Sequence, residues 1–444
     1  MNNYDYFFKN LVSLPNIQNN LLILKIDSCN LINYYVYIKD NSFDYINSLK
    51  SLEELSLRYF NFEYAFKLKL FNLKKLKLIK CDNISLDESI PFNLKKLKIY
   101  MGIINKSDSL IKFPKLEKCF LFRNFNYSQE EYDKIIDFES LINLKKLTME
   151  FKEFKFIKNK YYLKSLEDLR LKYVHLIDEE YINQILLFKK LKYLDMKINK
   201  IDFSEIKKIK TKNNSLSEIN IEWNEDTDCQ FAFLQEKFPN LIKCNITSTV
   251  NKNKNIIIEI KQNNFSKVNT INISGALNNL YINCANYENL KEIKIFSKNK
   301  IKNIIDNSFP IFCENSKIIF KSLKIFVFDY HENYVDLKLL INIYNNLDNM
   351  PILKYFELKV ISKDINEEFH KKLIRKLLSL NLDTCILRIK KKLLVSFEEN
   401  IFNKNELKDI FPKMKDVCFY DKIYIEKIEK DTNNNLDNFE FEFI

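Results

Sequence analysis

The residues that most often perform catalysis are few and scattered in this chain of 444 residues. Its three histidines are His175, His331 and His370, which are far apart and lack the spacing of metal ligands. The segment 224–228, NEDTD, gathers three carboxylates, but it is shorter than a calcium-binding loop and lacks its final glutamate, so we interpret it as a polar turn. Glycine occurs only twice, which excludes a glycine-rich phosphate loop, a dinucleotide fingerprint and a nucleophile elbow. We therefore expect no enzyme activity, no metal and no cofactor.

Lysine and aromatic residues alternate with leucines between residues 73 and 173, and this pattern suits binding. Lysine attracts carboxylates and phosphates, whereas exposed aromatic rings are typical of interfaces. Acidic residues are few in this stretch, and from about residue 191 to 268 the corresponding positions become mixed and polar. The candidate partner-binding residues are Lys75, Lys77, Lys96, Lys98, Tyr100, Lys118, Phe120, Phe122, Arg123, Lys146, Arg170, Lys172 and Tyr173.

The net charge of +12 is compatible with two interpretations of these lysines. A basic surface of this kind could bind an acidic partner or the phosphates of a nucleic acid. Only five of the 71 basic residues are arginine, however, and bidentate recognition of phosphates and bases favours arginine. Lysines on an ordinary solvated surface therefore remain the alternative.

The elements that position these residues are repeated. The phrase Asn-Leu-Lys-Lys-Leu begins at Asn72 and returns at Asn93 and Asn143. When these copies and similar segments of the chain are aligned, they share a repeat frame. Positions 1, 4, 6 and 11 of the frame are apolar, and position 9 is asparagine, cysteine or apolar. Alternation within the frame turns positions 3, 5 and 7 to one face and the leucines to the other, as in a strand. The frame begins at Leu21, Leu52, Leu73, Leu94, Leu116, Leu144, Leu166, Leu191, Leu216, Leu241, Val268, Leu290, Leu323, Leu353, Leu382 and Met414.

This frame resembles the pattern L-x-x-L-x-L-x-x-N/C-x-L of the leucine-rich-repeat family. The resemblance covers the chain from about Leu21 to Tyr420. It implies an α/β fold, a curved horseshoe- or arch-shaped solenoid with a parallel β-sheet on its concave face. It also implies that asparagine or cysteine at position 9 caps backbone groups in the turn after the strand. Many repeats carry apolar residues there, which predicts irregular turns.

The spacing of the repeats indicates what connects the strands. Steps of 21 or 22 residues across Leu52–Leu116 leave room only for extended or 3₁₀ returns. We expect helices where the steps are longer, at Ser128–Ile136 after a capping box and at Asp178–Leu186. The C-terminal third, including Asp364–Leu377, should carry true α-helices on the convex face.

No composition break divides the array. We expect residues 1–20 to form an N-terminal cap, residues 21–420 a solenoid of about sixteen repeats, and residues 421–444 a C-terminal cap that covers the last edge of the sheet.

The nine cysteines include no Cys-x-x-Cys pair. Cys29, Cys81, Cys119, Cys244 and Cys385 fall on core positions of the frame, which predicts reduced, buried thiols. The N-terminus lacks the basic region and cleavage site of a signal peptide, and no apolar run reaches the roughly 18 residues that span a bilayer. We expect a cytoplasmic protein, with the nucleus as the alternative, and no membrane contact.

Three functions fit this pattern. The leading hypothesis is a non-catalytic protein–protein interaction scaffold that binds an acidic protein, or a second copy of itself, through the concave face or the ends of the solenoid. The second is binding of a nucleic acid or ribonucleoprotein through the lysines and aromatic residues. The third is a ubiquitin-ligase substrate adaptor, by analogy with repeat proteins that carry an F-box, although no separate N-terminal helical module is evident.

Overall fold

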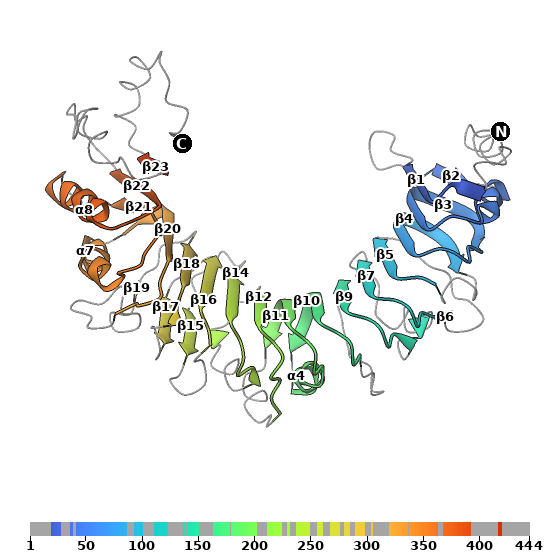
Figure 1. Ribbon diagram of the computed structural model, residues 1–444, viewed down its shortest axis with the longest axis horizontal. Helices are drawn as coiled ribbons and strands as arrows, with labels where there is room; N and C mark the ends of the chain where they lie inside the picture. Colours follow the sequence, from blue (N-terminus) through green and yellow to red (C-terminus); the bar gives the residue numbers. More distant parts are fainter. Residues whose placement is uncertain are drawn as a thin grey trace, which may run out of the picture. The chain divides into compact units, whose positions relative to one another are not determined.

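The structure is a computed structural model of the chain, shown in Figure 1. It describes residues 19–27, 36–38, 41–86, 93–100, 111–122, 136–137, 140–150, 163–177, 179–201, 211–223, 229–230, 237–248, 255–260, 267–275, 279–284, 289–297, 303–304, 319–335, 337–362, 367–391 and 416–419. The chain forms two compact units, Met1–Leu216 and Ser217–Ile444.

The first unit is built on parallel strands that pair in the order of the repeats, from β1 through β3, β4, β5, β7, β9 and β10 to β11. A short strand β2 pairs with the middle of β3, beyond the part that β1 covers, and β6 pairs with β8 in a separate two-stranded sheet. The described connections of this unit include the 3₁₀ helix η1 and the α-helix α4. The bounds are β1 Ile23–Asp27, β2 Val36–Ile38, η1 Asn41–Ser48, β3 Glu54–Leu68, β4 Lys75–Leu86, β5 Lys96–Tyr100, β6 Ile111–Lys112, β7 Lys118–Phe122, β8 Ile136–Asp137, β9 Lys146–Glu150, β10 Asp168–Ile177, α4 Glu179–Leu186 and β11 Tyr193–Ile201.

The second unit repeats this plan with two parallel sheets. Its repeat strands are β12, β14, β16, β18, β20, β21, β22 and β23, while β13, β15, β17 and β19 form a second sheet on the return segments. The bounds are β12 Glu218–Trp223, β13 Cys229–Gln230, β14 Lys243–Ser248, β15 Asn255–Ile260, β16 Thr270–Gly275, β17 Asn279–Cys284, β18 Glu292–Ser297, β19 Asn303–Ile304, β20 Ile325–Tyr334, α7 Leu337–Asn346, η5 Leu347–Asn349, β21 Tyr355–Ser362, α8 Glu367–Ser379, β22 Thr384–Lys391 and β23 Asp416–Phe419.

The buried core follows the repeat frame that the sequence predicts. Every first-position residue from Leu52 to Leu382 is at most 3% exposed, and each frame from Leu21 to Met414 contains one repeat strand. Full burial of a leucine side chain stabilises a fold by about 1.5–3 kcal/mol relative to exposure. Because the strands pair in register, the leucines of each repeat lie against those of its neighbours and form a continuous core within each unit.

The connections agree with the predicted spacing in most places. Helix α4 lies where a helix was expected at Asp178–Leu186, and Ile182, Ile185 and Leu186 are buried. In the C-terminal third, α7 connects β20 to β21 and α8 connects β21 to β22. The 21-residue steps carry extended returns, because β3 and β4 continue beyond the frame as strands of 15 and 12 residues.

One expected helix is contradicted at its last residue, while its residues 128–135 lie outside the described residues. Ile136 was expected on a helix that followed the capping box at Ser128, but it lies in β8, paired with Ile111 of β6. The step from Leu116 to Leu144 therefore returns at this point as extended chain. Strand pairing with the preceding return replaces the helical hydrogen bonds that the local sequence favours.

Two residues within the long strands β3 and β4 lie in the left-handed region, Tyr59 with a φ of 64° and Lys80 with a φ of 48°. Both occupy position 8 of their repeats. The next residue is buried in the core, and there the Cys81 thiol lies 3.3 Å from the carbonyl oxygens of both Leu57 and Ile79, either of which can accept its single proton. This cysteine at position 9 therefore bonds to the backbone at a bend within the continuous strand β4, where the resemblance implied a cap in a turn.

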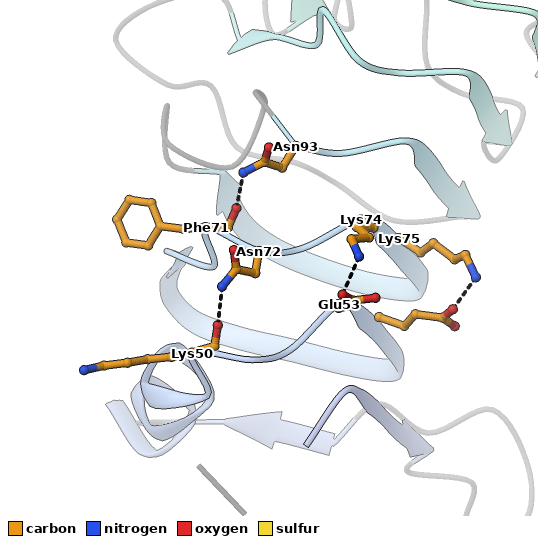
Figure 2. A network of polar contacts seen from close by, with 8 residues as sticks. Lys50, Glu53, Phe71, Asn72, Lys74, Lys75 and Asn93 are labelled. Atoms are coloured by element: carbon orange, nitrogen blue, oxygen red, sulfur yellow. Dashed lines mark hydrogen bonds and ion pairs between the residues drawn. The ribbon is translucent and has the colours of Figure 1, made fainter. Parts of the chain in front are cut away.

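The asparagine of Asn-Leu-Lys-Lys-Leu links successive repeats (Figure 2). Asn72 Nδ2 donates to the Lys50 carbonyl oxygen at 2.7 Å, and Asn93 Nδ2 donates to that of Phe71 at 2.5 Å. In the third copy, Asn143 Nδ2 donates to the Pro114 carbonyl oxygen at 2.7 Å. Each of the three copies of the phrase therefore makes the same kind of contact with the repeat before it.

Several expectations lie outside the described residues. These include most of the N-terminal cap at 1–20, the C-terminal cap at 421–444, the acidic turn at 224–228, and Cys29. No described helix has both the length and the apolar character required to cross a bilayer.

Candidate partner-binding surface

The predicted binding residues lie on the outward face of the sheet in the first unit. We call the described ones the lysine–aromatic surface. Arg123 lies outside the described residues, and Tyr173 lies on β10 with only its backbone described. The lysine–aromatic surface consists of Lys75, Lys77, Lys96, Lys98, Tyr100, Lys118, Phe120, Phe122, Lys146, Arg170 and Lys172.

Position 3 of the repeats forms a row of four lysines in register across β4, β5, β7 and β9: Lys75, Lys96, Lys118 and Lys146. A carboxylate closes each end of this row. Glu54 on β3 pairs with Lys75, and Asp168 on β10 pairs with Lys146. Among the described residues, the two middle lysines form no ion pair, so their positive charges remain available to a ligand.

Position 5 forms a second row, in which Lys77, Lys98, Phe120, Thr148 and Arg170 lie in register. The arginine of this row, Arg170, already forms hydrogen bonds within the chain. Arg170 Nε donates to Asp168 Oδ1 at 3.0 Å, and this bond raises the pKa of the guanidinium.

The rings of Phe120 and Phe122 are each accompanied by two ammonium groups. Lys96 Nζ lies 5.7 Å and Lys146 Nζ 6.0 Å from the centroid of Phe120. Lys98 Nζ lies 5.7 Å and Lys172 Nζ 5.9 Å from the centroid of Phe122. These distances fall within the range of cation–π attraction. The lysines are thereby held beside the rings, and both rings remain only half-buried.

Tyr100 extends this aromatic cluster. Its ring centroid lies 5.7 Å from that of Phe122, and its side chain is 38% exposed. Glu150 lies in register with Phe122 on the other side, and burial raises the pKa of its carboxyl group, against the opposing effect of Lys172 and Lys197. The cluster thus presents aromatic carbon surrounded by positive charge, with one carboxyl group at its edge.

Electrostatic crowding is strongest at Lys77. Burial lowers the pKa of its ammonium group, and so do the charges of its neighbours Arg58, Lys98, Lys25 and Lys96. The first and last strands of this cluster, β1 and β5, are far apart in sequence. The sequence interpretation began the basic row at Lys75 and therefore missed Lys25 and Arg58, although Lys25 occupies position 5 of the first frame.

A hollow of about 400 Å³ opens on the outward face beside Lys77. Four strands of the first unit contribute to it: β1, β3, β4 and β5. It is lined by Lys25, Ile26, Asp27, Glu54, Leu55, Ser56, Arg58, Lys75, Leu76, Lys77, Lys96 and Lys98.

In the second unit, the outward positions that were predicted to be mixed and polar carry side chains that hydrogen-bond to one another. Asn245 donates from Nδ2 to Asn220, and Asn272 Nδ2 donates to Asn245 Oδ1 at 2.7 Å. Thr247 and Ser274 share a hydrogen bond of 2.8 Å. This ladder connects side chains of successive repeats and leaves fewer polar groups for a partner than the lysine–aromatic surface does.

No group of three or more His, Cys, Asp or Glu residues in the part of the chain that the structure describes is placed to hold a metal ion. His175, His331 and His370 lie on three different elements, β10, β20 and α8.

No protein-family profile matches the chain, and no curated protein matches it in sequence. Many solved structures are similar to the chain, including the following three. TLR13 in its complex with ssRNA13 is 14% identical with a TM-score of 0.43, over 91% of this chain and 59% of TLR13, so this chain spans less than two thirds of that protein. The internalin InlF of Listeria monocytogenes is 14% identical with a TM-score of 0.38, over 94% of this chain and 95% of the internalin. A leucine-rich-repeat protein of Leptospira interrogans is 16% identical with a TM-score of 0.39, over 93% of this chain and 94% of that one.

The stronger evidence is in the chain itself. Its first-position leucines are buried, its repeat strands pair in parallel and in register, and a position-9 cysteine bonds to a backbone carbonyl oxygen of the preceding repeat. These features show that the chain has the leucine-rich-repeat fold.

Proposed function

We propose that this protein is a non-catalytic scaffold whose lysine–aromatic surface binds a partner protein with an acidic, partly apolar surface. The strands that carry this surface are paired on both sides, so a partner meets a preformed face and little conformational entropy is lost on binding. Charge complementarity argues for an acidic partner, because Lys96 and Lys118 lack carboxylate partners among the described residues.

The observation that carries the proposal is the placement of Phe120 and Phe122 between lysine amines from neighbouring strands. An apolar side chain of the partner can cover each ring while carboxylates beside it pair with the amines. Interfaces are commonly dominated by a few aromatic or arginine anchors with charged groups around them. The two rings are therefore the expected anchors, and the lysines set the orientation and the rate of association.

Two features favour a protein over a nucleic acid. The arginine that could read phosphates or bases, Arg170, is already bonded to Asp168. In addition, only five of the 71 basic residues of the chain are arginine, whereas bidentate recognition of phosphates and bases favours arginine. Nucleic-acid binding and pairing with a second copy are outcomes that the experiment below distinguishes.

The test uses an array of synthetic acidic peptides in matched pairs, one with leucine or phenylalanine and the other with serine at the same places. A single-stranded oligouridylate serves as the nucleic-acid probe. We expect the protein to bind acidic peptides that carry apolar residues, and to lose about tenfold or more in affinity when Phe120 and Phe122 are replaced by alanine. Phe71→Ala is the matched control, since Phe71 is 64% exposed and lies in a turn outside the lysine–aromatic surface.

Isothermal titration measures the affinity for each peptide and for oligouridylate, and light scattering measures whether the protein dimerises. Tighter binding of oligouridylate, with a steep loss of affinity as salt rises, would replace the proposal by nucleic-acid binding. Dimerisation that the double alanine variant abolishes would identify the partner as a second copy. Equal losses in the double variant and in Phe71→Ala would show that the rings are not anchors.

A further inference from the structure

We propose that the hollow between β1 and β5 is a binding site for a small molecule that carries two or more phosphate groups. This site differs from the proposed partner-binding function and stands or falls separately from it. It shares Lys75, Lys77, Lys96 and Lys98 with the lysine–aromatic surface, but its centre lies on β3 and β4, away from the two anchor rings.

The first argument is the charge of the lining. Six basic and two acidic side chains line the hollow, which leaves a formal excess of four positive charges. Both acids are already paired: Asp27 Oδ2 accepts from Arg58 Nη1 at 2.8 Å, and Glu54 pairs with Lys75. The remaining cations are Lys25, Lys77, Lys96 and Lys98, and none of them forms an ion pair with a described residue.

The second argument is the shape of the hollow. Lys25, Ser56, Lys77 and Lys98 form one row in register across four strands. Neighbouring strands lie about 4.8 Å apart, so the Cα atoms of Lys25 and Lys77 are separated by about 10 Å. The short side chain of Ser56 lies between them and leaves the space open. The volume of about 400 Å³ falls within the range of small-molecule sites.

The third argument selects the ligand class. Lysine amines are compact point charges on flexible stems, which suits the oxygens of phosphate groups. A single carboxylate could not balance four positive charges, whereas two or more linked phosphates carry several negative charges over a distance similar to the lysine row. The pKa of Lys77, which burial and the positive charges of neighbouring basic side chains both lower, is consistent with this assignment.

The test uses inorganic tripolyphosphate as the probe, with orthophosphate and sulfate for comparison. Binding to the purified full-length chain is measured by isothermal titration at low salt. We expect tripolyphosphate to bind at least about tenfold more tightly than sulfate. Lys77→Gln should weaken tripolyphosphate binding by about tenfold or more, since it removes one charge-assisted contact.

Two further variants distinguish binding within the hollow from general attraction by the positive charge of the surface. Ser56→Leu fills the hollow and leaves every charge in place, so it should reduce binding as strongly as Lys77→Gln does. Lys95→Gln removes the same charge from an exposed neighbour that does not line the hollow, and it should leave affinity within about twofold. Far-ultraviolet circular dichroism confirms that each variant is folded.

Mass spectrometry after acylation of lysines provides an independent measurement. Tripolyphosphate should protect Lys25, Lys77 and Lys98 from the reagent and leave Lys95 reactive. The proposal is overturned if Ser56→Leu binds as tightly as the wild type, if Lys95→Gln and Lys77→Gln weaken binding equally, or if sulfate binds as well as tripolyphosphate. Because no partner protein is present, none of these results depends on the scaffold proposal.

Discussion

Lys77 of β4 lies directly opposite Lys98 of β5, so two like charges face each other across a strand pair. Like charges in this arrangement destabilise a sheet by roughly 0.2–1 kcal/mol. Lys75 and Lys96 repeat the arrangement on the same two strands. The outward face thus holds positive charges together although this lowers its stability, as expected of a surface that binds an anion or an acidic protein.

Lys77→Gln should therefore raise the free energy of unfolding by a few tenths to about 1 kcal/mol at low salt. Urea denaturation followed by circular dichroism measures this difference. The difference should vanish near about 1 M salt, where the Debye length falls to about 3 Å. Lys95→Gln is the control and should change stability by less than about 0.5 kcal/mol. A loss of stability in Lys77→Gln at low salt would show that the charges on this face do not repel one another as inferred.

The same crowding predicts a dependence on pH. The folded chain lowers the pKa of Lys77 below 10.5, so between the lowered value and 10.5 the unfolded state binds more protons than the native state. Stability contributed by this residue must then rise with pH across that window. Lys77→Gln should lack this contribution. A difference between wild type and variant that stays constant from pH 8 to about pH 10.5 would contradict the assignment.

Reversal of Lys77, Lys98 and Lys172 to glutamate should abolish binding of an acidic partner without unfolding the chain. These lysines lie on the outward face, and surface substitutions usually change stability by less than about 0.5 kcal/mol. Reversal of Lys50, Lys95 and Lys145, which are exposed and outside the lysine–aromatic surface, changes the net charge equally and is the matched control. Equal losses of binding in the two triple variants would show that net charge alone governs the interaction.

The repeat strands could be predicted from the sequence because the burial of each leucine follows from the alternation of apolar and polar residues within a few positions of it. Leu73, Leu76 and Leu78 alternate with polar residues, and all three are buried as expected. The same local logic located α4, where apolar residues follow an acidic first turn. Ile136 shows the limit of that logic, because a return strand from another repeat outweighed the helical pattern.

The site could be predicted only in part, because its properties depend on neighbours about 21 to 28 residues away. Ile79 and Thr148 occupy outward positions yet are 9% and 3% exposed. Ile79 lies in register between Arg58 and Tyr100, two residues with long side chains. The hollow arises in the same way, since Ser56 is short while its neighbours in register are lysines. Alternation along one strand cannot reveal such contacts.

The buried thiols should react slowly in the native protein. Burial raises the pKa of Cys81 from 9.0 to about 11, and those of Cys119 and Cys244 to about 12. At pH 8 the reactive thiolate is therefore rarer than in a free thiol by roughly a hundredfold or more. Cys385 is also buried.

Alkylation with iodoacetamide, read peptide by peptide in a mass spectrometer, measures these rates. We expect Cys81, Cys119, Cys244 and Cys385 to be labelled within minutes in guanidinium chloride and to remain largely unlabelled over the same time without it. Rapid native labelling of all four would mean that the frame is out of register with the core.

The asparagine contacts between repeats should each contribute to stability. Asn72, Asn93 and Asn143 donate from their side-chain amides to carbonyl oxygens of the preceding repeat. Replacing any one of them by alanine should lower the free energy of unfolding by about 0.5–1.5 kcal/mol, the usual net value of a hydrogen bond. Asn72→Ala and Asn143→Ala involve separate repeats, so their effects should add to within about 0.5 kcal/mol in urea denaturation.

Asn72→Asp distinguishes this contact from a preference of the turn for asparagine. Aspartate keeps the size and the turn-forming tendency of asparagine, but an ionised carboxylate cannot donate to the Lys50 carbonyl oxygen and would face it as a second acceptor. We therefore expect Asn72→Asp to be at least as destabilising as Asn72→Ala at pH 7. Wild-type stability in Asn72→Asp would show that the turn conformation, and not the hydrogen bond between repeats, explains why the phrase recurs.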